Sequence, residues 1–301
     1  MKLSIVISTY NRAASLERTL ASVKSMADEI IVIDNESLDE TVAIAKKFGA
    51  KVYTRPNNLM LNVNKNYGFT KASGDWILCL DDDEEVTSEL AREIKEAMKA
   101  QDVSGYWIPR KNIIFGRFIQ HGIWWPDQQL RLFKKGSGKY SEKHVHEYIE
   151  VEGATRVMKN PYVHYNYDTL AQFLDKMQRV YTDSEVNKYV AAGYRVHWRD
   201  AIRFPVSDFL KLYFAQSGYK DGLHGLVLAM LQGFYSFIIF VKLWEREKFR
   251  EVDVHPPQMF DELHKSGGEL GYWVYTTKIK EEKNPIVRLW YRLLRKVISS
   301  S

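Results

Sequence analysis

The chain has 301 residues, of which 45% are hydrophobic and 27% are charged, so it is neither a disordered nor a collagen-like protein. Its one cysteine, Cys79, excludes an intrachain disulfide and indicates a reducing compartment. The formal net charge is +5, and residues 278–301, with seven Lys or Arg and two Glu, carry all of this excess. Such a local basic tail indicates a local anionic partner rather than a nucleic acid, since nucleic-acid-binding proteins more often spread basic charge over a folded face.

The first hundred residues alternate predicted strands with predicted helices. Apolar runs, typical of strands buried on both faces, predict strands at 3–7, 29–34 and 76–80, and a further strand is predicted at 51–54. The segments that follow these strands are predicted to form helices at 13–24, 38–48, 62–72 and 87–100. We therefore expect an α/β fold, with a mixed, mostly parallel sheet and helices on both faces.

The rest of the chain changes character twice. Short β-like segments separated by Gly, Pro and aromatic residues continue the sheet over 104–167, so we expect residues 1–167 to form one domain. Residues 168–250 are predicted to be helical and to pack on that domain, where they could also contact the membrane. Residues 251–301 are polar at first and contain Pro-Pro and Gly-Gly pairs, so we expect an irregular segment followed by a helix at 285–298.

Five acidic residues follow the fourth predicted strand, at 81–85. Carboxylates gathered at a strand end repel one another, so the arrangement is costly without a cation. Oxygen ligands suit Mg²⁺ or Mn²⁺, and such an ion could bridge nucleotide phosphates and stabilise a departing diphosphate. The position after an apolar strand favours a ligand role for Asp81 and Asp83, whereas Glu84 and Glu85 could equally begin the next helix.

Two further side chains could contact a nucleotide at the carboxyl ends of the strands, where such sheets bind ligands. Asp34 ends the second strand, and its carboxylate could accept hydrogen bonds from a base imide or a ribose hydroxyl. The alternative is a cap of the next helix, a role that Ser37 or Asp39 could fill. Lys65 precedes the acidic strand and could reach a phosphate, or it could be a solvated surface lysine.

The N-terminal half resembles glycosyltransferase family 2, whose members have the GT-A fold. The resemblance is carried by SIVISTYNR at 4–12, IVIDNESLDET at 31–41 and NKNYGFTKASGDWILCLDDDEEV at 64–86. It implies a UDP-sugar donor and a divalent ion, Mg²⁺ or Mn²⁺, held by a D-x-D pair at Asp81 and Asp83. It also implies nucleotide-sugar contacts at Thr9, Asn11, Asp34, Lys65 and Asp81.

The second half resembles a narrower branch, the bacterial lipopolysaccharide core β-1,4-glucosyltransferases. This resemblance implies inverting transfer of glucose from UDP-glucose to a hydroxyl of a lipid-linked glycan at the cytoplasmic face of the membrane. Transfer to polyprenyl phosphate or to a protein side chain is an alternative within the fold, and a protein that binds nucleotide sugars without turnover is another. The matching segments are WWPDQQLRLFKKG at 124–136, VHEYIE at 145–150, VHYNY at 163–167, KMQRVYTDSE at 176–185 and the DG–G segment at 221–225.

An inverting transferase needs a base that takes the proton of the acceptor hydroxyl. Asp127 is the candidate, because the aromatic residues before it could stack on a sugar and because its position roughly matches that of the base in the family. The alternative for Asp127 is a turn aspartate after Pro126, and Glu147 is the reserve candidate. His146 could complete the metal shell or contact a phosphate, although a lone histidine is more often structural.

Two segments bear on membrane contact. Residues 225–241 lack charge but only reach the lower limit for a spanning helix, so a buried or interfacial helix is favoured. The helix at 285–298 combines an apolar stripe with adjacent basic residues, which is typical of helices that bind an anionic membrane surface. The alternative is a helix docked on its own core with a solvated basic face. We expect a protein of the cytoplasm, peripheral on the inner face of the cytoplasmic membrane. The stripe consists of Ile286, Leu289, Trp290, Leu293 and Val297.

Overall fold

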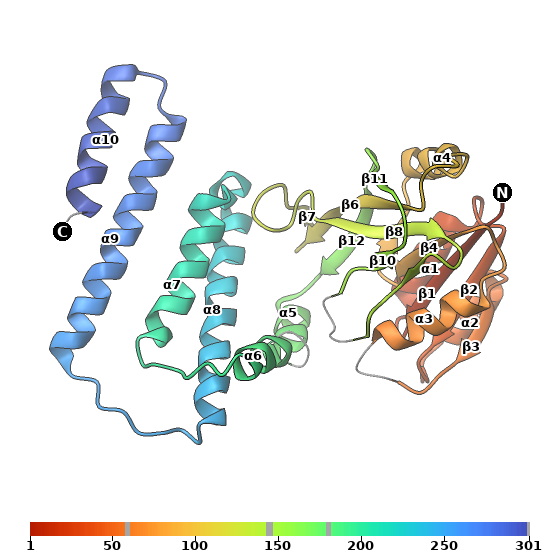
Figure 1. The fold of residues 1–301 in the computed structure, drawn as a ribbon, viewed down its shortest axis with the longest axis horizontal. Helices are drawn as coiled ribbons and strands as arrows, with labels where there is room; N and C mark the ends of the chain where they lie inside the picture. Colours follow the sequence, from red (N-terminus) through yellow and green to blue (C-terminus); the bar gives the residue numbers. More distant parts are fainter. Residues whose placement is uncertain (58–60, 143–146, 179–181, 300–301) are drawn as a thin grey trace. The chain divides into compact units, whose positions relative to one another are not determined.

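A computed structural model describes residues 1–57, 61–142, 147–178 and 182–299 of the chain (Figure 1). The chain divides into two compact units, each described here by itself. Unit 1 comprises Met1–Phe118 and Trp124–Asp168, and unit 2 comprises Ile119–Ile123 and Thr169–Ser301. A finer division of the helical part at residue 250 stays a prediction.

The first half of unit 1 is a parallel sheet with the strand order β3-β2-β1-β4. Each predicted strand and helix of this half is present, so the predicted α/β architecture is confirmed. Its strands are β1 (Leu3–Thr9), β2 (Glu29–Asp34), β3 (Lys51–Thr54) and β4 (Trp76–Asp81). Its helices are α1 (Ala13–Val23), α2 (Thr41–Lys47), α3 (Leu61–Lys71) and α4 (Ser88–Ala97).

The second half of unit 1 makes the sheet mixed. Strand β8 pairs antiparallel with both β4 and β6, and β12 runs parallel to β6, giving the order β4-β8-β6-β12-β5. The larger strands are β6 (Gly105–Ile114), β8 (Gln128–Lys134) and β12 (Tyr162–Tyr167). The short ones are β5 (Glu84–Glu85), β7 (Arg117–Phe118), β9 (Gly138–Lys139), β10 (Glu150–Val151) and β11 (Thr155–Val157).

The apolar runs of the central strands are continuous because both faces of the sheet are covered. Ile5 and Ile7 face one core with Leu16 and Leu20 of α1, whereas Val6 faces a second core with residues of α3. Side chains of successive strand residues alternate between faces, so a strand with two buried faces needs apolar residues at nearly every position. The polar residues are therefore left for the strand ends.

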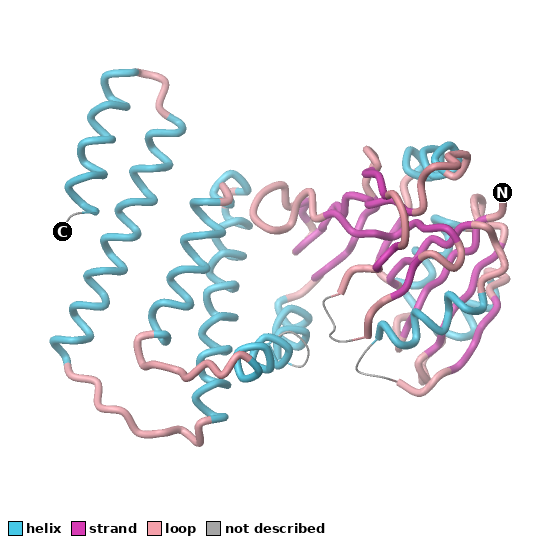
Figure 2. The backbone as a smooth tube through the Cα atoms, viewed as in Figure 1, coloured by secondary structure: helices cyan, strands magenta, loops and turns pink. Residues whose placement is uncertain are grey.

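Unit 2 is built of helices in the described part of the chain (Figure 2). Helix α7 packs on α8, and α10 packs on α9. Val186, Ile239 and Leu243 are among the buried residues that join α6 to α8. The helices are α5 (Leu170–Lys176), α6 (Thr182–Ala191), α7 (Asp200–Leu210), α8 (Leu223–Arg246), α9 (Pro256–Glu281) and α10 (Pro285–Ser299), with a π-turn at Lys211–Ala215 and a 3₁₀ turn at Gly218–Asp221.

The prediction of an irregular segment after residue 250 is wrong over most of its length, because α9 occupies 256–281. Pro256 and Pro257 begin this helix, where a missing backbone N–H costs nothing. One of the glycines inside it serves close packing. A Cβ atom on Gly271 would lie 2.5 Å from the Ile298 side chain of α10, so the small residue lets the two helices approach.

The DG–G segment at 221–225 holds a tight turn in unit 2. The buried Asp221 carboxylate accepts the backbone N–H groups of Gln120 and His121 at 3.2 and 2.9 Å. Gly222 has a φ of +63°, a conformation that favours glycine. Gly225 passes so close to the Gly218 carbonyl that no side chain fits. The segment therefore anchors the loop that leads into Trp124.

Helix α8 is long and apolar enough to cross a membrane by length and composition, with about a third of its most apolar stretch buried in the structure. Leu228, Ala229 and Gly233 are buried on one side. Met230 and Phe234 remain exposed on the other. The helix thus packs along one face only.

Replacing Gly225 by Ala is expected to lower the thermal unfolding midpoint strongly, because the new Cβ atom would lie 1.8 Å from the carbonyl oxygen of Gly218. A backbone atom cannot rotate away, so we expect a loss of about 3 kcal/mol or more. Gly267→Ala is the matched control: it also lies inside a helix, and no described atom is within 4 Å of the added Cβ. It should gain up to about 1 kcal/mol. Equal midpoints for the two variants in a thermal-shift assay would contradict this packing.

Candidate active site

Several predicted site residues of unit 1 gather where β1, β2 and β4 end. The strand register pairs Thr9 with Asp34 and Ser8 with Asp81, so the three ends lie at one edge of the sheet. Thr9 and Asp34 are buried, each with 2% of its surface exposed. Buried Asn35 ties two of the ends together, because its amide nitrogen donates to Ser8 Oγ and to the Thr9 carbonyl at 3.0 and 2.8 Å.

Asn11 and Asp34 hold the loops that follow β1 and β2. The Asn11 side-chain oxygen accepts the backbone N–H of Leu38 at 2.7 Å, and the Asn11 N–H donates to Ser37 Oγ at 2.9 Å. The Asp34 carboxylate accepts the Ser37 N–H at 3.2 Å. The structure thus brings these two predicted nucleotide-binding residues together. It also gives each a part in shaping the loops.

Four ionisable side chains form a buried cluster at the end of β4. Lys65 of α3 pairs with Asp81 Oδ1, and Arg131 of β8 contacts Asp81 Oδ2 at 2.6 Å. The same guanidinium contacts Glu84 at 2.6 Å. Glu84 is fully buried and also accepts the Asp81 backbone N–H at 2.9 Å. At Asp81, Lys65 and Arg131 therefore supply the positive charge that the acidic run requires.

Burial and ion pairing act in opposite directions on this cluster. Burial opposes charge on Asp81, but Arg131 and Lys65 hold the pKa of its carboxyl well below the usual range. Burial likewise opposes charge on Lys65, but Asp81 raises the pKa of the ammonium group. For Glu84, burial outweighs Arg131 and raises the pKa to about 7. At neutral pH the cluster thus holds two cations, one full carboxylate and one half-ionised carboxyl group.

The two other aspartates of the acidic run face different partners. Burial and the Asp83 carboxylate raise the pKa of Asp82, and the Thr9 hydroxyl opposes this shift. The resulting pKa is about 7. Asp83 Oδ1 lies 3.4 Å from His164 Nε2. The side chains of Asp81 and Asp83 are therefore directed to different partners in the structure.

A polar chain runs from Asp83 to Asp127. His164 Nδ1 lies 2.6 Å from Asn112 Oδ1, and Asn112 Nδ2 donates to Asp127 Oδ2 at 3.1 Å and to the Trp124 carbonyl at 2.7 Å. Because both partners of Nδ2 are acceptors, the amide orientation is fixed, and the proton between Asn112 and His164 belongs to His164 Nδ1. In the neutral ring, Nε2 then carries the lone pair that faces Asp83.

Three side chains hold the Asp127 carboxylate. Arg110 Nε and Nη2 lie 2.8 and 2.6 Å from Oδ2, which Asn112 also contacts. Gln129 donates to Oδ1 at 2.8 Å. The side chain is 16% exposed, so it is oriented by the protein and still reaches solvent. Of the two oxygens, Oδ1 has the smaller set of donors in the described structure.

The two remaining predicted site residues are placed differently. The Glu147 carboxylate accepts hydrogen bonds from Ser141 Oγ at 2.6 Å, the Glu142 N–H at 2.9 Å and Asn62 Nδ2 at 3.3 Å. These contacts fasten its own loop to α3. His146 lies outside the described residues.

A divalent ion would need side-chain ligands that lie close together. Among the described residues, no three His, Cys, Asp or Glu side chains lie together in a way that could hold a metal. Asp83 and His164 form a pair, and their 3.4 Å separation fits two ligands that each lie about 2.1 Å from one ion. Such a pair suits an ion whose other ligands are water and phosphate oxygens, as Mg²⁺ prefers.

Sequence reasoning missed the side chains that join these groups. Arg131 stands in the apolar run LRLF of β8, and a charged residue inside a buried strand is a signal that a partner must be near. Arg110 and Asn112 interrupt β6 in the same way. His164 lies within β12, and its sequence neighbours do not indicate its partners.

The chain is similar to several known proteins. A family model described as glycosyl transferase family 2 matches residues 4–157, just over half of the chain. An uncharacterized glycosyltransferase of Rickettsia bellii is 30% identical over 256 residues, which cover 81% of this chain and 86% of the relative. The lipopolysaccharide core biosynthesis glycosyltransferase LpsC of Rhizobium meliloti is 25% identical over 259 residues, covering 83% of this chain and 94% of LpsC. Residues 1–349 of S. aureus TarS in complex with UDP match with a TM-score of 0.46 and 13% identity, covering 85% of this chain and 95% of that one.

Replacing Arg131 by Met is expected to lower the free energy of unfolding by about 3–5 kcal/mol at pH 8, because buried carboxylates lose their cation. Adding Glu84→Gln should recover part of this loss. Folded Glu84 keeps its proton up to about pH 7, whereas the unfolded chain releases it near 4.5, so this group costs stability as the pH rises between these values. The Arg131→Met loss should therefore be smaller at pH 5. Denaturant unfolding of the wild type, Arg131→Met and the double variant measures these losses. Equal losses at pH 5 and pH 8 would contradict this account.

Proposed function

Because the chain belongs to glycosyltransferase family 2, we propose that it transfers glucose from UDP-glucose to a hydroxyl of a lipid-linked glycan such as lipopolysaccharide core, with inversion at the anomeric carbon. The chain is a glycosyltransferase by its family and by the names of its relatives. The donor sugar, the acceptor and the metal requirement belong to the proposal. The observation that carries it is the polar chain that joins Asp83, beside the proposed diphosphate site, to Asp127.

The proposed donor site is the edge at which β1, β2 and β4 end. Asp34 and Thr9 would bind the uridine, with Asn11 shaping the loop above it. The Asp34 carboxylate accepts the Ser37 N–H and still has lone pairs that can accept a hydrogen bond from the base imide. Lys65 beside Asp81 places a positive charge where a diphosphate would lie. The buried position of these groups supports a preformed nucleotide site.

Asp83 and His164 would hold a divalent ion, Mg²⁺ or Mn²⁺, together with phosphate oxygens of the donor. When bound, such an ion neutralises charge that develops on the leaving diphosphate. His164 fits this role because its Nδ1–H donates to Asn112 Oδ1, which orients the ring with Nε2 towards Asp83. Asp81 is the other member of the D-x-D pair, and its carboxylate contacts Lys65 and Arg131.

Asp127 is the proposed base. The acceptor hydroxyl oxygen forms a bond to the anomeric carbon as the bond from that carbon to the diphosphate oxygen breaks, and UDP leaves with the electron pair. Asp127 Oδ1 takes the hydroxyl proton. Arg110 and Asn112 fix the carboxylate through Oδ2, so that Oδ1 faces one direction. Such positioning lowers the entropy that the reaction must lose.

The exposed face of helix α10 supports our proposal that the protein acts at the anionic inner face of the cytoplasmic membrane. Its Tyr291 and Ile298 face α9, and Arg295 stacks on Tyr272 with its guanidinium carbon 5.2 Å from the ring centroid. The helix is therefore docked by one side only. The opposite stripe stays between 53% and 78% exposed, at Ile286, Leu289, Trp290, Leu293 and Val297.

Asp127→Asn is expected to lower transfer of radiolabelled glucose from UDP-glucose to a truncated lipopolysaccharide by about 10²–10⁴-fold, because the base is lost. UDP should still raise its melting midpoint in the presence of Mn²⁺ as it does for the wild type. Asp83→Asn should lose both transfer and the Mn²⁺-dependent part of the UDP shift. Near-normal transfer by Asp127→Asn would show that this residue is not the base. A wild-type chain that no uridine nucleotide stabilises would refute the donor site.

The protein is expected to bind vesicles that contain phosphatidylglycerol, and Arg288→Gln with Arg292→Gln should weaken this binding about 30-fold at low salt. This figure follows from about 1 kcal/mol for each basic residue near anionic lipid. Leu289→Ser with Trp290→Ser should weaken binding at every salt concentration. Leu270→Ser, exposed on α9, is the matched control and should have little effect. Binding is measured by cosedimentation with the vesicles. If the control variant and the α10 variants lost binding equally, α10 would not be the membrane contact.

A further inference from the structure

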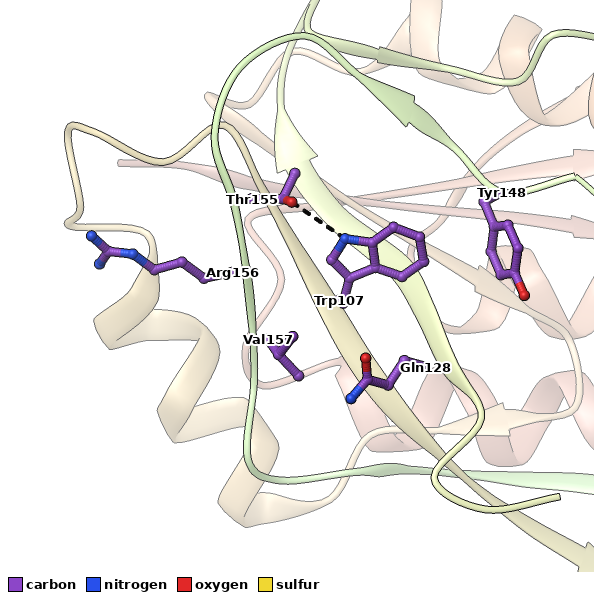
Figure 3. A pocket seen from close by; sticks show the side chains of 6 residues that line it. All are labelled: Trp107, Gln128, Tyr148, Thr155, Arg156 and Val157. Carbon is purple, nitrogen blue, oxygen red and sulfur yellow. Dashed lines mark hydrogen bonds between the residues drawn. The ribbon is translucent and has the colours of Figure 1, made fainter. Parts of the chain in front are cut away.

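A cavity of about 450 Å³ opens on unit 1 over β6, β8 and β11, apart from the predicted site residues (Figure 3). Its volume lies within the range of small-molecule sites. Neither the proposed donor site nor the proposed base uses it. It is lined by Trp107, Gln128, Tyr148, Thr155, Arg156 and Val157.

Two aromatic rings form the apolar part of this cavity. The Trp107 indole N–H donates to Thr155 Oγ1 at 3.3 Å, which fixes the ring, and the inner edge of Trp107 packs on the core of unit 1. The Tyr148 ring stands beside it, with 5.4 Å between the ring centroids and 59° between the planes (Figure 3). Tyr148 is 52% exposed. A fixed ring loses little conformational entropy when a ligand stacks on it.

The polar part of the cavity is neutral. The exposed Gln128 amide offers both donors and an acceptor, and the Thr155 hydroxyl offers a second acceptor. The Arg156 guanidinium points away from Trp107 (Figure 3) and pairs with Asp102 at 2.6 Å. Of the lining side chains, Arg156 is the one with a permanent charge. This environment suits an uncharged ligand and is wrong for a diphosphate.

We propose that this cavity binds one glucopyranose-type unit of a saccharide chain. A pyranose with equatorial hydroxyls presents C–H groups on its faces and hydroxyls around its edge. The faces match the Trp107 and Tyr148 rings, and the edge matches the Gln128 amide. Among the lining residues, a charged ligand would meet one charged side chain, Arg156, which is already paired with Asp102.

The cavity is separate from the proposed catalytic position. Successive residues of an extended chain point to opposite faces, and Asp127 faces Arg110 while Gln128 lines the cavity. The bound sugar would therefore be a further unit of the glycan acceptor and not the unit that is glycosylated. The inference rests on the proposed function only for the origin of that glycan, since binding needs neither UDP nor a metal ion.

The experiment titrates the full-length, ¹⁵N-labelled protein with cellobiose and follows the Trp107 indole N–H signal by NMR. Trp107→Phe assigns the signal. Saturable shifts are expected, with a millimolar dissociation constant. Tyr148→Ala should weaken binding at least tenfold and Tyr148→Phe should retain it, because the ring and not its hydroxyl makes the contact. Since Tyr148 is exposed, its truncation should leave folding and UDP-induced stabilisation unchanged.

Two results would overturn the proposal. One is the absence of a saturable shift up to about 20 mM cellobiose in a protein that UDP still stabilises. The other is equal cellobiose affinity in the wild type and Tyr148→Ala. In both cases the proposed donor site would stand, because its readout is the separate UDP shift.

Discussion

The buried ion cluster at the end of β4 is the constraint on which the rest of unit 1 depends. Arg131 is 4% exposed inside an apolar strand, and an unpaired buried charge would cost several kcal/mol. Its partners come from β4 and β5, and Lys65 adds a contact from α3. The cluster therefore fastens the parallel half of the sheet to the mixed half. A shift of one half against the other would leave a charge without its partner, so the edge that carries the functional groups is held rigid.

Sheet register places the middle members of the second set of polar groups, whereas Asp83 and Asp127 lie just outside the strands. Strand β12 lies between β6 and β5, and the pairing sets His164 opposite both Asn112 and Glu84. Asp83 is the next residue before Glu84, and Asn112 lies two residues beyond Arg110 on the same face of β6. The contact between Asn112 and His164 in the polar chain follows directly from this register. A slip of one residue in β12 would turn His164 to the opposite face.

Local pattern was sufficient for the parallel half of the sheet, because apolar runs and helical spacing act within a dozen residues. It located Asp34 and Asp81 at strand ends for the same reason. It did not connect Arg131, Asn112 or His164 with the site, since β8, β6 and β12 meet only through tertiary pairing. It failed over α9 because Pro and Gly signals are ambiguous: the same residues end a helix, begin one, or let two helices approach. The partner helix that decides between these outcomes lies outside the segment.

Asp81 and Asp83 of the acidic run differ in what they can offer a further cation. Asp81 already has a side-chain cation on each oxygen, so another cation must displace one of them and gains only the difference in interaction energy. Asp83 faces His164, whose Nε2 atom lies 3.4 Å from Oδ1 and whose Nδ1–H donates to Asn112. Under the proposed function, a divalent ion at Asp83 and His164 would leave the ion pairs of Asp81 intact. An anionic diphosphate beside Lys65 would exchange one anion for another as the ammonium group is partly released from Asp81. The proposal therefore assigns the metal ion and the diphosphate to different parts of one acidic run.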